Sequence, residues 1–196
     1  MEKAALLKSI AETGYNVGFG AKKHFATYDI VEKVPGWIAF LSIAIGVYGL
    51  VFEQLSGKTL AATLVVSGIV GLYIFFYDSQ KMSYEKAGRE LTQIYNRLRD
   101  LYREVQSAPA RDLAAAEQSL RALESEYYCK CISKQILFSD WYAHYKFFWQ
   151  HQIDWIDEQK RFRFLRDKVP LTFYFALAAL LLAAVVLSVR WWIRAG

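Results

Sequence analysis

The residue types that most often bind metals or attack substrates are few in this sequence. The two cysteines, Cys129 and Cys131, have no neighbouring set of Cys or His residues, so they do not make a zinc site and we interpret them as packing residues. His24, His144 and His151 likewise lack partner ligands at metal-binding spacing. No phosphate-binding Gly loop and no nucleophile elbow is present. The sequence therefore predicts no metal, no cofactor and no enzymatic activity.

One segment could bind a ligand by stacking and phosphate contacts. Aromatic residues crowd between Phe138 and Phe164, and basic residues follow them closely. Aromatic rings stack on bases and Arg pairs with phosphate, so Trp155, Arg161 and Arg163 are candidate nucleotide contacts. The alternative is that these rings are buried, or that they lie at the headgroup level beside a membrane span.

Three stretches without charged residues predict the elements that would position any such site. They cover residues 34–52, 59–77 and 169–189. A bilayer core about 30 Å thick needs roughly 20 apolar residues in a helix, which satisfies its own backbone hydrogen bonds. We therefore expect three transmembrane helices, preceded by a cytoplasmic amphipathic region over residues 1–33 that ends at a Pro35-Gly36 break.

The distribution of Lys and Arg predicts the orientation of these spans. Five basic residues precede the first span, one lies between the first two, sixteen lie between the second and third, and two follow the third. Positive residues stay on the cytoplasmic side. This places the N-terminus and residues 78–168 inside a bacterial inner membrane and the C-terminus outside, anchored by Trp191 and Trp192.

Each of the first two spans carries a stripe of small and polar residues at steps of three or four. Such a stripe either packs helices closely or lines a water-accessible path in an oligomer. Its acidic members lie at opposite membrane faces, where rings of carboxylates would favour cations. The stripes consist of Ser42, Gly46, Gly49 and Glu53 in the first span and Thr63, Ser67, Gly71 and Asp78 in the second.

The segment over residues 78–168 predicts a long cytoplasmic helical hairpin. Its apolar residues alternate steps of three and four up to a break at residues 107–109, and a second run follows from Leu113 to Tyr127. We expect the second span to continue straight into the first helix of this hairpin. The apolar residues of that helix form a seam, and we expect this seam to hold protomers together. The assembly residues of the seam are Leu91, Ile94, Leu98, Leu101 and Val105. The predicted fold class is an all-α integral membrane protein with three transmembrane helices and a coiled-coil-like hairpin, followed by an outer anchor over residues 169–196.

The layout resembles a known family. The lead-in GYNVGFGAKKHFATYDIVEK, the tight two-span hairpin and the helix YEKAGRELTQIYNRLRDLYREV look like the SLATT domain, a two-transmembrane module associated with nucleotide-second-messenger systems. The resemblance covers roughly residues 10–106. It implies a membrane effector of antiphage defence that forms pores or perturbs the membrane once a partner signals infection. The third span and the aromatic segment from Trp141 to Trp155 depart from that pattern.

These observations favour an oligomeric effector whose first two spans line an inducible, ion-permeable path. The partners expected are further copies of the chain, membrane lipids, and a nucleotide second messenger or cytoplasmic sensor protein as the trigger. Nucleic acid is not expected, because residues 78–168 hold sixteen basic and fourteen acidic residues in a near-balanced mixture. Two alternatives stay open: a non-conducting membrane scaffold that recruits partners through the hairpin, and a direct nucleotide receptor.

Overall fold

The computed structural model describes residues 2–53, 57–107, 109 and 113–195, with side chains placed up to Ser188. Within these ranges the chain is helical, with turns and loops and no β-strand. It divides into two compact units, Met1–Lys160 and Arg161–Gly196, and each is described by itself. Three helical runs in the described ranges, α1, the run that starts with α2, and α8, are long and apolar enough to cross a membrane.

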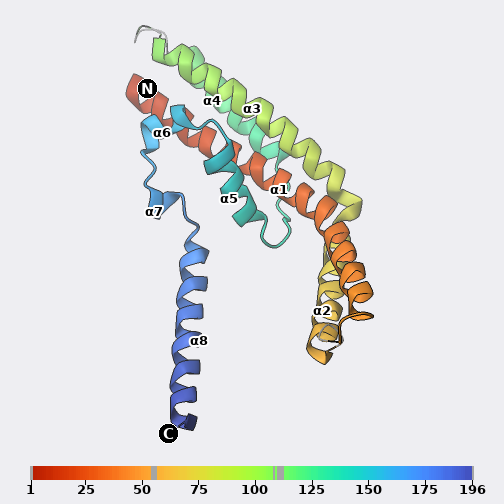
Figure 1. Ribbon diagram of the computed structural model, residues 1–196. Coiled ribbons are helices and arrows are strands. Elements are labelled where there is room, and N and C mark those ends of the chain that lie inside the picture. The colour runs from red at the N-terminus through yellow and green to blue at the C-terminus, as the bar shows by residue number, and fades with distance from the viewer. Residues whose placement is uncertain (1, 54–56, 108, 110–112, 196) are drawn as a thin grey trace. The chain divides into compact units, whose positions relative to one another are not determined.

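Helix α1 spans Lys3–Gly49 without interruption, which at about 1.5 Å per residue is roughly 70 Å. The predicted break at Pro35-Gly36 was wrong, because Pro35 lies inside the helix. A proline in a helix interior removes one backbone hydrogen bond and bends the helix, and Figure 1 shows α1 changing direction in its orange part. Just before the proline, Val31 is buried in a core cluster and Val34 packs against the same cluster. These contacts stabilise the helix next to Pro35.

The second span continues less directly than predicted. Helix α2 covers Lys58–Phe75, a turn follows, and the 3-10 helix η2 covers Asp78–Gln80 before α3 begins. Helix α3 covers Lys81–Ser107. Counted by length and composition, Lys58–Ser107 is one helical run, but the backbone hydrogen bonds divide it at the turn. Figure 1 shows α2 beside the last part of α1 and α3 beside its first part.

The seam of α3 packs chiefly against α1 of the same chain rather than against the following helix. Its apolar residues are buried at the steps of three and four that the sequence shows. Helix α4, Ala114–Lys130, also contacts α3, so the predicted hairpin exists but is one side of a larger bundle. The buried members of the seam are Tyr84, Ala87, Leu91, Ile94, Leu98, Leu101 and Val105.

Two glycines of α1 let aromatic side chains approach its backbone. Trp155, from α6 (Asp154–Lys160), packs on Gly14, and Tyr95 and Phe147 pack on Gly18. Phe147 belongs to α5, Ser139–Gln150, which lies along α1 in Figure 1. The first part of α1 is therefore the central element of a helical body, formed by α1 residues 3–33 with α3, α4, α5 and α6.

The second unit holds α7, Phe164–Asp167, and α8, Leu171–Ala195. The Tyr174 hydroxyl donates a hydrogen bond of 2.6 Å to the Leu165 carbonyl and joins the two helices. Helix α8 contains the third predicted span. The predicted Trp191 and Trp192 anchor lies outside the described side chains.

Candidate functional site

The two predicted stripes lie on α1 and α2, whose apolar parts run side by side as a span hairpin. Gly46 and Gly49 line a groove of about 230 Å³ together with Gly57, Leu60 and other residues of both helices. A Cβ added at Gly46 would meet no atom within 4 Å. The first stripe therefore borders α2 without being filled by it, and space for a neighbouring helix, lipid or water remains.

The hydroxyls of the second stripe are satisfied within α2. Thr63 donates to the Thr59 carbonyl and Ser67 donates to the Thr63 carbonyl, both at 2.9 Å. A hydroxyl bonded to the preceding turn tolerates lipid, a packed helix or water. Ser67, Gly71 and Ser42 are half-buried and Thr63 is exposed in the single chain.

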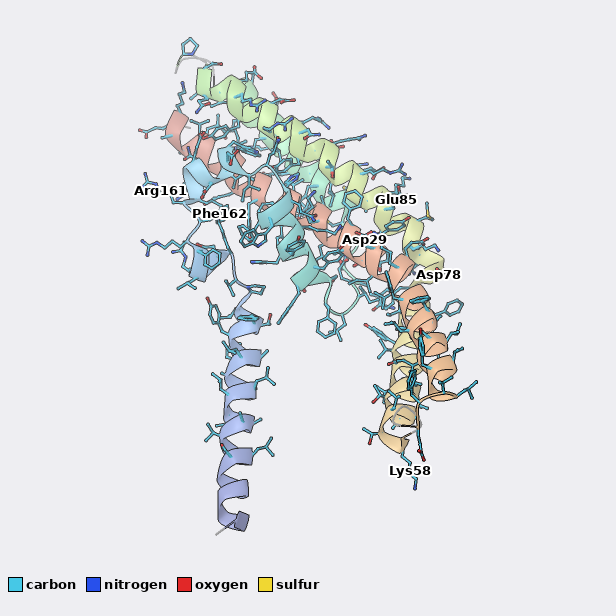
Figure 2. All side chains as sticks on the ribbon, in the orientation of Figure 1. Asp29, Lys58, Asp78, Glu85, Arg161 and Phe162 are labelled. Atoms are coloured by element: carbon cyan, nitrogen blue, oxygen red, sulfur yellow. The ribbon has the colours of Figure 1, made fainter. Side chains whose placement is uncertain are left out.

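The acidic residues of the stripes lie at opposite ends of the hairpin. Glu53 is exposed near the turn that precedes α2, whereas Asp78 begins η2 at the other end. Figure 2 shows Lys58 and Asp78 at the two ends of the α2 segment. Lys81 Nζ lies 3.0 Å from Asp78 and 2.9 Å from Glu32, so Asp78 belongs to an ion-pair network where the spans meet the helical body.

Sequence reasoning missed a junction loop over residues 131–138, between α4 and α5, that several hydrogen bonds join to the helices around it. Ile136 is 3% exposed and packs in a cluster with Val31, Ile74, Tyr77 and Tyr84. That cluster joins α1, the end of α2 and the start of α3. In the sequence this loop shows only as an apolar run that starts at Ile136, after the polar residues Ser133, Lys134 and Gln135.

Hydrogen bonds attach the junction loop to all three helices. Tyr84 donates to the Lys134 carbonyl at 2.7 Å, and the Leu137 amide donates to the Tyr73 hydroxyl at 3.3 Å. Thr27 donates to the Gln135 side chain at 2.6 Å. The loop therefore joins the span hairpin to the helical body by hydrogen bonds, in addition to the covalent connections through α1 and the turn after α2.

His24 fixes the start of this loop. Its buried ring lies 2.7 Å from the Gly20 carbonyl through Nδ1, and its Nε2 accepts the Ile132 amide at 3.0 Å. An acceptor at Nε2 places the proton on Nδ1, so the ring is neutral. Burial lowers the pKa of His24, and this effect outweighs the hydrogen bond with the Gly20 carbonyl, which raises it. His24 is therefore a buried residue that holds α1 and the junction loop together.

An ion pair ties α5 to α1 next to the junction. Lys146 Nζ and Lys33 Nζ each lie 2.6 Å from a carboxylate oxygen of Asp29. Burial alone would raise the pKa of Asp29, but the hydrogen bonds from Lys146 and Lys33 hold it below its usual range. The carboxylate therefore stays charged and keeps α5 on α1.

The candidate nucleotide contacts are distributed over the two units. Trp155 is 7% exposed, with its Nε1 donating to the Tyr95 hydroxyl at 3.0 Å, so its ring is part of the core. One edge borders a pocket of about 180 Å³ that also has Arg99 and Arg103 in its lining. Arg161 and Arg163 belong to the second unit, and their role as ligand contacts stays a prediction.

Burial and positive neighbours also lower the pKa of a histidine, His151, at the end of α5. Burial, with the charges of Lys22 and Arg99, lowers the pKa of His151 to about 4. The centroid of its ring lies 4.4 Å from that of Tyr95, and the two ring planes are inclined at 48°. Among the described residues no group of three or more His, Cys, Asp or Glu could hold a metal ion. Cys129 is exposed, so the packing role predicted for it was wrong.

The assembly seam has a partner inside the chain. Leu91, Ile94, Leu98, Leu101 and Val105 are all buried against the helical body. Their role in holding protomers together stays a prediction, and it would require these side chains to leave their present contacts.

Comparison with known proteins identifies the family of the chain. No curated protein and no solved structure matches it. A family model described as SMODS and SLOG-associating 2TM effector domain 6 (SLATT_6) matches residues 1–177. The match contains α1 and α2 completely and ends near the start of α8. The chain therefore belongs to the SMODS and SLOG-associating 2TM effector domain 6 family.

Proposed function

We propose that the protein is an oligomeric membrane effector of nucleotide-second-messenger-linked antiphage defence, and that its span hairpin lines an inducible ion-permeable path. Opening of this path would perturb the membrane and arrest or kill the cell. The observation that carries the proposal is the small, polar face of the span hairpin, which the single chain leaves uncovered at Gly46. The effector family gives the biological setting.

The uncovered hairpin favours an assembly over a monomer. Its apolar side chains are mostly exposed in the single chain, and lipid can cover Leu and Val faces without cost. A stripe of glycine and hydroxyl residues gains from close approach of another helix or from contact with water. We therefore place Ser42, Gly46, Ser67 and Gly71 toward the axis of the oligomer.

The orientation proposed follows the basic residues. The N-terminus and the helical body would lie in the cytoplasm and the C-terminus outside a bacterial inner membrane. A trigger could then reach the helical body from the cytoplasm. The pocket beside Trp155 measures about 180 Å³, below the about 300–1,000 Å³ of typical small-molecule sites. The pocket beside Trp155 is therefore small for a whole nucleotide, and we propose a cytoplasmic sensor protein as the trigger.

The test is conductance of the purified protein in a planar bilayer, together with its oligomeric mass in nanodiscs. Ser67→Leu would narrow the path, and Val65→Leu is the matched control because it lies about 200° away around α2. We expect discrete currents from a defined oligomer, reduced by Ser67→Leu and unchanged by Val65→Leu. A silent oligomer, with candidate sensors or cyclic nucleotides added, would favour the non-conducting scaffold. Lost assembly in Ser67→Leu would assign the stripe to packing.

Nucleotide binding can be tested separately from conductance. The receptor alternative predicts saturable binding of cyclic nucleotides that is lost when Trp155, Arg161 and Arg163 are replaced. Because Trp155→Ala would also disturb the core, Arg161→Gln with Arg163→Gln is the informative variant. Absence of saturable binding to the unaltered chain would remove the receptor alternative.

A further inference from the structure

Two large apolar side chains project from the tip of the junction loop. Leu137 is 62% exposed and Phe138 is 65% exposed, whereas Ile136 and Ser139 on either side of them are buried. Isolated exposed apolar residues are ordinary in proteins. Two adjacent ones, at the tip of a loop that is otherwise held by hydrogen bonds, form an apolar projection that needs a partner.

The backbone at the tip adopts an uncommon conformation. Phe138 has φ of 67°, in the left-handed region that bulky residues rarely occupy. The turn is closed by the Ser139 amide, which donates to the Ile136 carbonyl at 3.2 Å, and the Tyr142 amide donates to the Phe138 carbonyl at 3.1 Å. This turn sends Ile136 into the core and leaves Leu137 and Phe138 outside. An observed outlier of this kind supports an inference of function.

Contacts with α2 determine where the tip lies relative to the membrane. The Leu137 amide donates to the hydroxyl of Tyr73, which lies in the charge-free stretch 59–77 close to its end. The Tyr77 hydroxyl, at that end, donates to the Gln135 carbonyl at 3.5 Å. Tyrosines at the ends of spans lie at the membrane–water interface. The tip is therefore fixed at the depth where α2 meets the bilayer surface.

The surroundings of the tip have the composition of an interfacial segment. Trp141 is exposed one turn further along α5. Lys134 Nζ lies 5.0 Å from the centre of the Tyr77 ring at the base of the loop. Aromatic side chains with a nearby cation suit the headgroup layer, where rings contact acyl chains and the cation meets phosphate.

We propose that Leu137 and Phe138 insert into the interfacial layer of the phospholipid bilayer on the side of the helical body. The junction loop then attaches the helical body to the membrane surface at a second place, besides the spans. The inference uses the assignment of α1 and α2 as membrane spans and does not depend on conduction of ions.

The experiment measures the depth of a nitroxide label in the full-length protein. The native thiols are removed by Cys129→Ser and Cys131→Ser, and single labels are placed at Phe138→Cys and, in a second variant, Leu137→Cys. The protein is reconstituted in nanodiscs of phosphatidylcholine and phosphatidylglycerol. Labels at Val65→Cys and Glu104→Cys supply the lipid and water references, since Val65 is exposed on the span α2 and Glu104 is exposed on α3.

The readout is the ratio of collision rates with oxygen and with a water-soluble nickel chelate. We expect a ratio at position 138 or 137 several-fold above that at 104 and approaching that at 65. Ratios at both tip positions equal to that at 104 would overturn the proposal. Low accessibility to both reagents at both positions would also overturn it, because the tip would then be covered by protein. No current is measured, so this result is independent of the conductance test.

Discussion

Replacing Gly14 with alanine tests whether Trp155 packs on the backbone of α1. A Cβ at position 14 would come within 2.9 Å of Trp155 Cζ2 and closer still to Cη2. Real Cβ atoms almost never approach this near, and the indole is a rigid ring whose Nε1 is bonded to the Tyr95 hydroxyl. The ring or the helix must therefore shift, which breaks that hydrogen bond or opens the core between α1 and α6.

The magnitude follows from two opposing terms. Alanine is favoured over glycine in a helix by about 1 kcal/mol. Overpacking of a core costs about 1–3 kcal/mol, and a lost hydrogen bond costs roughly 1 kcal/mol more. The net effect of Gly14→Ala is a loss of about 1–3 kcal/mol. Gly20→Ala is the matched control on the same helix, because its Cβ would be 3.4 Å from Tyr127 Cε2, and it should gain up to about 1 kcal/mol.

Thermal unfolding in nanodiscs measures both variants under one scan rate. For a chain of this length, 1 kcal/mol corresponds to a Tm shift of about 2–4 °C. We expect Gly14→Ala to unfold several degrees below the unaltered protein and Gly20→Ala at or slightly above it. Equal shifts for the two variants would refute the packing of Trp155 on Gly14. Recovery of stability by Trp155→Leu in the Gly14→Ala background would identify the clash as its cause.

Three further predictions concern charge and hydrogen bonding in the helical body. Asp29→Asn leaves Lys146 without its carboxylate and should lower stability by about 1–3 kcal/mol in thermal unfolding. Tyr84→Phe removes the bond to the Lys134 carbonyl and should cost about 1 kcal/mol, with faster amide hydrogen exchange in the junction loop. The pKa of His151 is lowered from 6.5 to about 4, so as pH falls below 6.5 the unfolded chain binds the proton first and stability decreases toward pH 4. His151→Asn should remove that part of the pH dependence, on the order of 1 kcal/mol after screening by solvent at the half-buried ring.

The elements with a strong repeating pattern could be predicted from the sequence. Charge-free stretches marked the apolar parts of α1, α2 and α8 because the bilayer imposes a length and excludes charge. Apolar residues spaced alternately three and four positions apart marked the buried face of α3 from Tyr84 to Val105. Both patterns follow from local geometry, so they are visible in a single chain.

The partner of that buried face could not be predicted. A seam of apolar residues shows that something covers it, and both a second protomer and another helix of the chain satisfy the pattern equally. Glycines at 14, 18 and 20 lower the helix propensity of the first part of α1. They are the places where Trp155, Tyr95 and Tyr127 approach it. Tertiary packing on a long partner outweighed the low helix propensity of glycine.

The junction loop escaped prediction for a different reason. Its stability comes from side chains far apart in sequence: Ile132 bonds to His24, and Tyr84 bonds to Lys134. No short motif encodes such bonds. Trp155 shows that composition alone does not separate two environments: an aromatic residue near basic ones is compatible with a stacking platform and with burial, and the ring lies in the core beside Tyr95.

The course of α1 changes how a signal would reach the proposed path. Helices α2 and α3 are joined through a turn and η2, and α1 runs from the helical body into the span hairpin with Pro35 inside it. Rotation of α3 alone would have to break the Tyr84 bond to the junction loop and displace the cluster around Ile136. Val31 of α1 belongs to that cluster, and Gly46 lies further along the same helix. A displacement of α1 would therefore reach both the cluster around Ile136 and the span hairpin, and Pro35 lies between these two parts of the helix.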